Sequence, residues 1–243
     1  MNILILCIFD ETDRNKKMQH FHRDNFVKHA SIDYYFITYD QNLMEDFKLI
    51  NDTLLIKGNE HCMNILDKTI SSFGYFINKK KYDFVVRTNI STVFNYSLLY
   101  TFLQDTPRNN VYTGGLFFKL AWIDEVYGIT KANIEKYNLN GLEYFQGTCI
   151  ILSYDVVKFI MDNSDKLIRD VIDDVSIGLF IKEHLPDAYL TYRNVKYSVI
   201  KKGDKIYNIN SVLYRHKSCN DDEDIKDMSN TFKIINAIIP SDV

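Results

Sequence analysis

Apolar runs alternate with amphipathic segments through the first hundred residues of the chain. Short apolar runs predict buried strands, and apolar side chains at helical spacing predict the helices between them. The expected strands are 2–9, 33–38, 53–57 and 84–86, and the expected helices are 18–30 and 61–78. This alternation favours an α/β fold, in which helices flank a mixed, mostly parallel central sheet in one Rossmann-like domain spanning residues 1–243.

The second half of the chain has a different pattern, with a polar, aromatic segment around Trp122 between two expected strands. The expected strands are 111–119, 143–153, 196–200 and 206–214, and the expected helices are 153–161, 173–184 and 225–239. Ser153 suits the start of one helix, and Asp173 or Asp174 suits the cap of the next. We therefore expect two halves within the domain, 1–110 and 111–243.

Composition excludes several classes of protein. The chain has a net charge of -3 and is 46% hydrophobic, so it has no excess positive field to bind nucleic acid or an anionic membrane. The apolar run 3–9 is too short to span a bilayer, which takes about 20 residues. The four cysteines are far apart and do not form a zinc motif. We expect reduced thiols and a cytoplasmic protein with no transmembrane segment.

The loop Arg87-Thr88-Asn89-Ile90-Ser91 follows the buried strand 84–86 directly. Ligands of open α/β sheets bind beyond the carboxyl ends of the strands, so we expect Asp10, Asp40 and the loop 87–91 to gather at one edge, with Phe9 beside Asp10. We therefore expect a binding site at this edge. The loop after the first strand lacks Gly-x-Gly-x-x-Gly, which argues against a dinucleotide-dependent dehydrogenase.

Four motifs occur in order between about residues 50 and 220. They are the helix 64–76 with Lys68-Thr69 leading into Phe84-Val85-Val86-Arg87-Thr88-Asn89, the segment Tyr144-Phe145-Gln146-Gly147-Thr148-Cys149-Ile150-Ile151-Leu152-Ser153, the segment Asp173-Asp174-Val175-Ser176-Ile177-Gly178, and the late His216. Together they resemble the β1,3-galactosyltransferase and Fringe-like superfamily of inverting glycosyltransferases, which have the GT-A fold. Each motif alone is weak, and their order and spacing carry the resemblance.

The resemblance implies transfer of a sugar from a nucleotide-diphosphate donor, UDP-linked, to a hydroxyl of a glycan, glycoprotein or glycolipid. Residues 1–110 would bind the donor and 111–243 the acceptor. Asp174 matches the catalytic base, which takes the proton of the acceptor hydroxyl. The expected donor-binding residues are Phe9, Asp10, Arg87, Thr88, Asn89, Ser91 and Arg215. The expected acceptor-binding residues are Trp122, Gly147 and Asp173.

The resemblance also implies a divalent cation, Mn²⁺ or Mg²⁺, but the carboxylates that usually hold it are missing. Asn89-Ile90-Ser91 stands where the superfamily has acidic residues, and a hard cation prefers carboxylate oxygens. Ser91 and His216 are the remaining candidate metal ligands. Alternatively, basic groups replace the metal at the leaving diphosphate; the candidates are Arg87, Lys201, Lys202, Arg215, His216 and Lys217.

Other interpretations remain open at this point. One is that Asp173 or Asp174 serves only as a helix cap. Another is that the chain is a non-catalytic domain that binds a sugar or nucleotide and has lost the metal-binding loop. A metal-dependent nuclease built on Asp173, Asp174 and Lys182 fits the acidic composition poorly. The superfamily is often Golgi-anchored, whereas this chain has no anchor, so we expect a microbial or viral enzyme of the cytoplasm, in the host cytoplasm if viral. The oligomeric state is left open.

Overall fold

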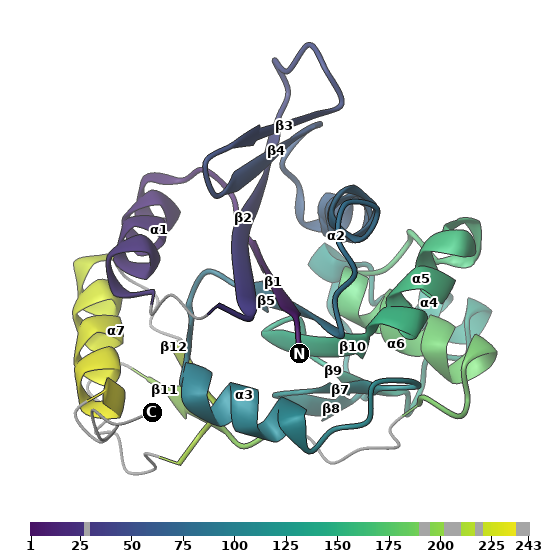
Figure 1. Cartoon of the computed structure of the whole chain (residues 1–243). Helices are drawn as coiled ribbons and strands as arrows, with labels where there is room; N and C mark the ends of the chain where they lie inside the picture. The colour runs from purple at the N-terminus through teal and green to yellow at the C-terminus, as the bar shows by residue number, and fades with distance from the viewer. Residues whose placement is uncertain (27–29, 190–194, 202–209, 217–220, 237–243) are drawn as a thin grey trace.

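A seven-stranded sheet forms the centre of the molecule (Figure 1). The computed structural model describes residues 1–26, 30–189, 195–201, 210–216 and 221–236. The strand order is β3-β4-β2-β1-β5-β10-β7, with β1 Ile3–Ile8, β2 Ile32–Asp40, β3 Phe47–Ile50, β4 Thr53–Lys57, β5 Phe84–Asn89, β7 Tyr112–Gly114 and β10 Cys149–Ser153. The strands β4, β2, β1 and β5 pair in parallel, whereas β3 and β10 pair antiparallel with their neighbours. This confirms the predicted α/β class with a mostly parallel central sheet.

Helices cover both faces of the sheet because its central strands are apolar on both faces. All six residues of β1 are buried. Leu4, Leu6 and Ile8 pack with α2 Ile65–Ile77, α5 Tyr154–Asp162 and α6 Asp173–His184 on one face. The alternate residues Ile3, Ile5 and Cys7 face α1 Asp13–Asn25, α3 Tyr96–Gln104 and α7 Asp221–Asn236 on the other. Continuous hydrophobic runs are expected of parallel strands buried in this way.

Two smaller sheets complete the fold. One has the order β11-β12-β6 and the other pairs β8 with β9. Their bounds are β6 Thr92–Phe94, β8 Phe117–Lys119, β9 Glu143–Phe145, β11 Tyr197–Ile200 and β12 Leu213–His216, with the short helix α4 Lys131–Lys136 between β8 and β9. None of the helices in the described ranges is both long and apolar enough to cross a bilayer.

The first helix begins earlier than its apolar pattern predicts. The expected range was 18–30, and the observed helix α1 is Asp13–Asn25. The side chain of Thr12 caps it by accepting from the backbone N–H of Asn15 at 3.4 Å. A capping side chain sets the first turn even where that turn has no apolar face. As a result, residues 13–15 are brought to the carboxyl end of β1.

The expected strands 111–119 and 143–153 are each broken in two. Gly114 ends β7 before β8 begins at Phe117, and the segment 146–148 separates β9 from β10. Neither break is visible in the apolar pattern, because each depends on close packing between segments distant in sequence. A Cβ at Gly114 would collide with the carbonyl oxygen of Cys149 and lie 2.8 Å from Cβ of Phe145.

The other boundaries differ less from expectation. The cap of α6 is Ile172, without a side-chain bond, and not Asp173 or Asp174. The elements α3, α4, β3 and β6 were not predicted. Residues 206–209 of an expected strand, residues 237–239 of the expected last helix, and Lys202, Lys217 and Cys219 lie outside the described residues.

The topology brings several loops to one edge of the main sheet. β1 and β5 are parallel, with Ile8 opposite Asn89, so both end at this edge. β10 is antiparallel to β5, with Cys149 opposite Thr88, so it begins at the same edge. The loops after Ile8, after Asn89 and before Cys149 therefore meet there, although they come from both halves of the chain.

Gly114→Ala is expected to lower the free energy of unfolding by about 1–3 kcal/mol, since the added methyl overpacks against backbone. Gly74→Ala in α2 is the matched control. Its Cβ would meet only the flexible end of Met161, at 2.9 Å, and helix propensity favours alanine by about 1 kcal/mol. Urea unfolding measures both, and equal effects of the two substitutions would contradict this packing account.

Candidate functional site

A cavity of about 570 Å³ lies where β1 and β5 end. Its walls come from the loop after β1, the first turns of α1, the segment before α2, the loop after β5 and the end of β12. The lining residues are Ile8, Phe9, Asp10, Arg14, Asn15, Met18, Glu60, His61, Cys62, Ile65, Lys68, Arg87, Asn89, Ile90, Ser91, Tyr127, Arg215 and His216. Tyr127 is the one lining residue among these that comes from the second half before β12, where it ends a short 3₁₀ helix, Glu125–Tyr127.

The structure brings most of the expected donor-binding residues together in this cavity. Phe9, Asp10, Arg87, Asn89, Ser91 and Arg215 line it, as does His216. Thr88 does not: its hydroxyl donates to the carbonyl of Thr148 at 2.7 Å inside the sheet. Alternation along a strand explains the difference, because successive side chains of β5 point to opposite faces.

Arg87 is buried at 3% exposure and links three segments of the chain. One nitrogen, Nη2, pairs with the carboxylate of Asp173 at 2.8 Å. The other, Nη1, donates to Oδ1 of Asn89 at 2.6 Å and to the carbonyl of Gly147. A Cβ at position 147 would collide with this guanidinium. Gly147 therefore allows close approach of its backbone to Arg87.

Asp173 and Asp174 begin α6 but have different surroundings. Asp173 is 1% exposed, and its carboxylate forms an ion pair with Arg87. Oδ2 of Asp174 accepts from the N–H of Gly147 at 2.9 Å, and its Oδ1 accepts from Val175 N–H at 2.8 Å. Burial, together with the neighbouring Asp173 carboxylate, raises the pKa of Asp174 to about 7. Asp174 does not line the cavity; its carboxyl group, which titrates near neutral pH, is linked through Gly147 to Arg87 in the cavity wall.

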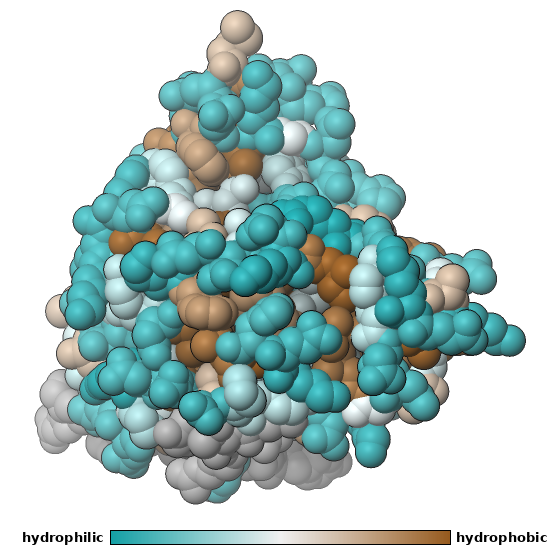
Figure 2. Space-filling model, turned by 90° about the vertical axis from the view of Figure 1, so that its right-hand side faces the viewer, coloured by the Kyte–Doolittle hydropathy of each residue, from teal (hydrophilic) through white to brown (hydrophobic). Residues whose placement is uncertain are grey.

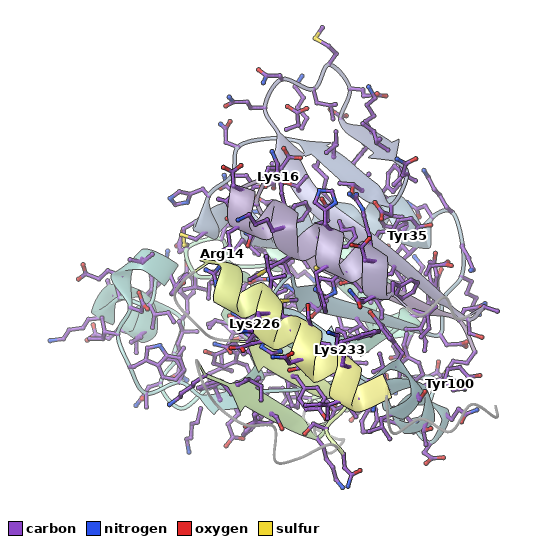
Figure 3. The ribbon with its side chains drawn as sticks, turned by 90° about the vertical axis from the view of Figure 1, so that its left-hand side faces the viewer. Arg14, Lys16, Tyr35, Tyr100, Lys226 and Lys233 are labelled. Carbon is purple, nitrogen blue, oxygen red and sulfur yellow. The ribbon has the colours of Figure 1, made fainter. Side chains whose placement is uncertain are left out.

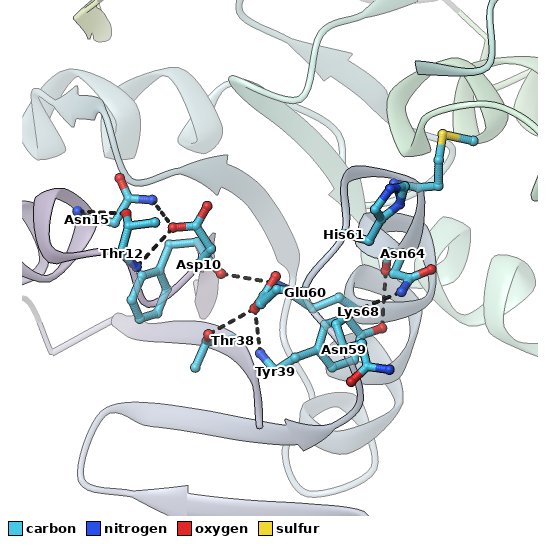
Figure 4. Close-up of polar contacts among 12 residues, drawn as sticks. Asp10, Thr12, Asn15, Thr38, Tyr39, Asn59, Glu60, His61, Asn64 and Lys68 are labelled. Carbon is cyan, nitrogen blue, oxygen red and sulfur yellow. Dashed lines mark hydrogen bonds and ion pairs between the residues drawn. The ribbon is translucent and has the colours of Figure 1, made fainter. Parts of the chain in front are cut away.

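Lys68 and Glu60 form a pair in the cavity wall that sequence reasoning did not assign to the site (Figure 4). Nζ of Lys68 lies 2.5 Å from the Glu60 carboxylate and donates to the carbonyl of Phe9 at 2.9 Å. Glu60 also accepts from the hydroxyl of Thr38 and the N–H of Tyr39. Burial lowers the pKa of Lys68, and the Glu60 charge opposes that shift. The pair ties α2 to the ends of β1 and β2.

Asp10 and the start of α1 form another wall (Figure 4). Oδ1 of Asp10 accepts from the side-chain amide of Asn15 at 2.6 Å and from the N–H of Thr12 at 3.2 Å. Arg14 follows in the first turn of the helix and also lines the cavity. Sequence reasoning missed Arg14 because it placed the helix start at residue 18; the available signal was Thr12, a good cap residue, three positions before Asn15.

His216 lies at the end of β12 with only 2% exposure. Its backbone N–H donates to the carbonyl of Ser91 at 3.0 Å, which places the two candidate metal ligands side by side. Burial, with smaller effects of Arg215 and His22, lowers the pKa of His216 to about 4, so its ring is neutral near pH 7. Within the described ranges, Nε2 of His216 has no hydrogen-bond partner.

The residues present do not fit a resident Mn²⁺ or Mg²⁺. In the described part of the chain, no three His, Cys, Asp or Glu side chains gather as a metal site. The oxygen of Asn89 already accepts from Arg87, and the Glu60 carboxylate is paired with Lys68. Hard cations favour carboxylate oxygens, so Ser91 and His216 alone make a weak ligand set.

Trp122 lies apart from the main cavity. It lines a shallower hollow of about 330 Å³ with Leu120, Ala121, Ile123, Ile134 and Asn140. The ring is partly exposed and packs edge-on against Phe118. Figure 2 views the side of the molecule that carries α4, α5 and α6, where hydrophobic residues are exposed among hydrophilic ones. The structure thus separates Trp122 from Gly147 and Asp173, which lie behind the main cavity beside Arg87.

Comparisons with known proteins give the family of the chain. A family model described as Galactosyltransferase matches residues 38–185, more than half of the chain. No curated protein matches the sequence. Among solved structures, a galactosyltransferase LgtC in complex with donor and acceptor sugar analogs is 12% identical, with a TM-score of 0.41 over 99% of this chain and 98% of that one. A glycosyltransferase involved in glycosylation of the major capsid of PBCV-1 is 11% identical, with a TM-score of 0.48 over 94% of this chain and 100% of that one.

Arg87→Met is expected to destabilise the fold by about 3–5 kcal/mol, because it leaves the carboxylate of Asp173 buried without its partner. The double variant Arg87→Met with Asp173→Asn removes both charges and is expected to recover part of that loss. Lys158→Met is the control, since Lys158 pairs with Asp162 on the exposed surface of α5 and such pairs contribute about 0–1 kcal/mol. Denaturant unfolding measures these three variants and the single variant Asp173→Asn, and additive effects of the two buried substitutions would contradict a strong Arg87–Asp173 coupling.

Proposed function

The chain belongs to the galactosyltransferase family, and from this premise we propose that it transfers a hexose from a UDP-linked donor to a hydroxyl of a glycan or glycoconjugate, with inversion and with Asp174 as the base. It is a glycosyltransferase that uses a nucleotide sugar. The inversion, the nucleotide and the role of Asp174 are the proposed parts. The observation that supports the role of Asp174 is its buried carboxyl group, linked through Gly147 to Arg87 in the wall of the main cavity.

The donor is proposed to bind in the cavity at the ends of β1 and β5. A volume of about 570 Å³ suits a ligand of this size, since small-molecule sites span about 300–1,000 Å³. Phe9 and Met18 supply apolar surface for a base or ribose, whereas Asn89, Ser91 and Arg215 supply polar groups. Ligands of open α/β sheets bind at such an edge, which supports this location.

Asp174 is proposed to take the proton of the acceptor hydroxyl. An effective general base has a pKa near the working pH, and burial beside Asp173 raises the pKa of Asp174 to about 7. The backbone N–H groups of Gly147 and Val175 fix the orientation of its carboxylate. Ile172 is the cap residue of α6, and Asp174 accepts from the first-turn N–H of Val175 as well as from Gly147.

The proposed step is a single displacement at the anomeric carbon. The acceptor oxygen forms a bond to that carbon from the face opposite the diphosphate. The bond between the anomeric carbon and the phosphate oxygen breaks, and the diphosphate leaves with the electron pair. The hydroxyl proton passes to the carboxylate of Asp174. The acceptor is proposed to approach from the side of Tyr127 and the hollow at Trp122, where aromatic rings are partly exposed and able to stack on a sugar face.

Asp174→Asn is expected to lower the rate of sugar transfer by about 10²–10⁴-fold, the usual contribution of a general base, while leaving donor affinity within about threefold. The amide oxygen can still accept from Gly147, so the loop should keep its position. Asp162→Asn, at an exposed carboxylate on α5, is the control and should transfer at the wild-type rate. Transfer and donor affinity are measured with a panel of UDP-sugars and simple glycoside acceptors. Unchanged turnover in Asp174→Asn would exclude this residue as the base, and binding without turnover in the wild type would favour a non-catalytic domain.

The raised pKa of Asp174 predicts opposite effects of pH on activity and stability. The base must be ionised, so kcat/KM should rise tenfold per pH unit below about 7 and level off above it. The folded state holds this proton more tightly than the unfolded chain, whose carboxyl pKa is about 3.8. The free energy of unfolding should therefore fall as pH rises from about 4 to about 7. Asp174→Asn should lack that component, as paired urea titrations at pH 5 and 8 can measure, and an identical pH response in both proteins would contradict the assignment.

A further inference from the structure

Glu60 is the accessible member of the ion pair that it forms with Lys68 in the wall of the main cavity. Both residues line this cavity, and Nζ of Lys68 lies 2.5 Å from the carboxylate. The side chain of Lys68 is 1% exposed, whereas that of Glu60 is 31% exposed. A ligand in the cavity would therefore meet the carboxylate of Glu60 rather than the ammonium group of Lys68.

The Glu60 carboxylate is held in one orientation by its neighbours (Figure 4). Oε1 accepts from the hydroxyl of Thr38 at 3.0 Å and from the N–H of Tyr39 at 2.7 Å, both near the carboxyl end of β2. Lys68 donates to both carboxylate oxygens and is itself fixed by the carbonyl of Phe9 at 2.9 Å. Because the carboxylate is already ordered, a ligand that binds it does not have to immobilise a free side chain.

Oε2 of Glu60 keeps the capacity to accept from a ligand. Oε1 accepts from three donors, whereas Oε2 accepts, in the described part of the chain, from Lys68 alone. An ionised carboxylate has about four acceptor sites and no proton to donate. The ligand group that matches it is therefore a hydrogen-bond donor, such as a hydroxyl.

The pair gives this part of the wall no net charge, because the ammonium group of Lys68 balances the carboxylate of Glu60. A diphosphate would gain little attraction here, and its negative charge would lie against a carboxylate of the same sign. A neutral ring that carries hydroxyl groups meets neither difficulty. This part of the wall therefore suits a sugar ring of the donor better than its diphosphate.

The position of Glu60 in the sheet indicates which ring of a nucleotide sugar it contacts. Glu60 is bound to β2, whereas the proposed base Asp174 is bound to Gly147, just before β10. Strands β1 and β5 lie between β2 and β10, and neighbouring strands are about 4.8 Å apart, so the two positions are separated by roughly 14 Å. The transferred sugar must lie near the base. The ring at Glu60 is then the ribose.

We propose that the carboxylate of Glu60 accepts hydrogen bonds from the ribose hydroxyls of the donor nucleotide, so that the site selects a ribonucleotide over its deoxy forms. This inference rests on the proposed function. A site built to bond a hydroxyl discriminates against an analogue that lacks it, because the polar group of the site is left without its partner. Hydrogen bonds to a charged group are also stronger than those between neutral groups. Glu60 is thus a specificity-determining residue of the donor site.

Isothermal titration calorimetry with UDP, GDP, CDP and ADP first identifies the nucleoside diphosphate that binds best to the full chain. The buffer contains Mn²⁺, so that a need for metal does not prevent binding. The 2′-deoxy and 3′-deoxy forms of that nucleotide are then compared with the ribonucleotide. We expect at least one deoxy form to bind about tenfold more weakly, which corresponds to about 1.4 kcal/mol. Equal binding of all three forms would overturn the inference and leave the proposed function standing.

Glu60→Gln is expected to reduce this discrimination to about threefold, because a neutral amide oxygen makes a weaker bond to the hydroxyl than a carboxylate does. Glu11→Gln is the matched control, since Glu11 is exposed, pairs with Lys16 at 3.5 Å and does not line the cavity. Figure 3 shows Lys16 on the side of α1 away from α7. The control should discriminate like the wild type. Full discrimination in Glu60→Gln would exclude Glu60 as the contact.

Thermal unfolding shows whether each variant folds. If Glu60→Gln does not, its combination with Lys68→Met replaces it, because the double variant leaves no lysine buried without its partner. The galactose-linked form of the same nucleotide distinguishes the two rings. If Glu60→Gln weakens binding of this nucleotide sugar but not of the free nucleotide, the carboxylate contacts the transferred sugar and the inference is overturned. Absence of binding by all four nucleoside diphosphates would overturn both the inference and the proposed function.

Discussion

The buried ion pair between Arg87 and Asp173 is the interaction on which the arrangement of the site depends. Two charges removed from water are costly unless they are paired, and both terminal nitrogens of Arg87 are paired through contacts from three segments. It joins the end of β5 to the start of α6 by the 2.8 Å pair and holds the carbonyl of Gly147 in between. Segments from residues 1–110 and from residues 111–243 are therefore fixed to each other beside the main cavity.

This pair also sets the electrostatic surroundings of Asp174. The charge of Asp173 and burial raise the pKa of Asp174, whereas Arg87 and the N–H of Gly147 lower it. A different partner for Asp173 would change this balance, so the ion pair and the titration of the proposed base are coupled. Arg87 also donates a hydrogen bond to the side-chain oxygen of Asn89. This oxygen, which the sequence alone would allow as a metal ligand, is therefore already bound. The Arg87 guanidinium thus contacts both the start of α6, where the proposed base lies, and the wall of the main cavity.

The sequence predicts the strands and the residues at their ends, because these depend on local pattern. The side-chain pairings and the strand breaks could be found only from the structure. Asp10, Asn89 and Ser91 were located at one edge because the carboxyl ends of parallel strands meet there. The partner of Arg87 was not predicted, since pairing between β5 and α6 depends on tertiary packing. Arg14 was missed because the cap at Thr12 precedes the apolar pattern. The strand breaks at Gly114 and Gly147 likewise reflect close approach of the backbone to other segments. Neither secondary-structure propensity nor hydrophobic periodicity can predict such contacts.

The central claim is a single displacement assisted by one carboxylate, and the configuration of the product tests it most directly. Proton NMR of the glycoside formed from an α-linked UDP-sugar distinguishes the two anomers by the coupling of the anomeric proton. The account predicts a β-linked product from the first detectable turnover. An α-linked product would contradict it, because retention requires a different mechanism from the direct displacement proposed for Asp174.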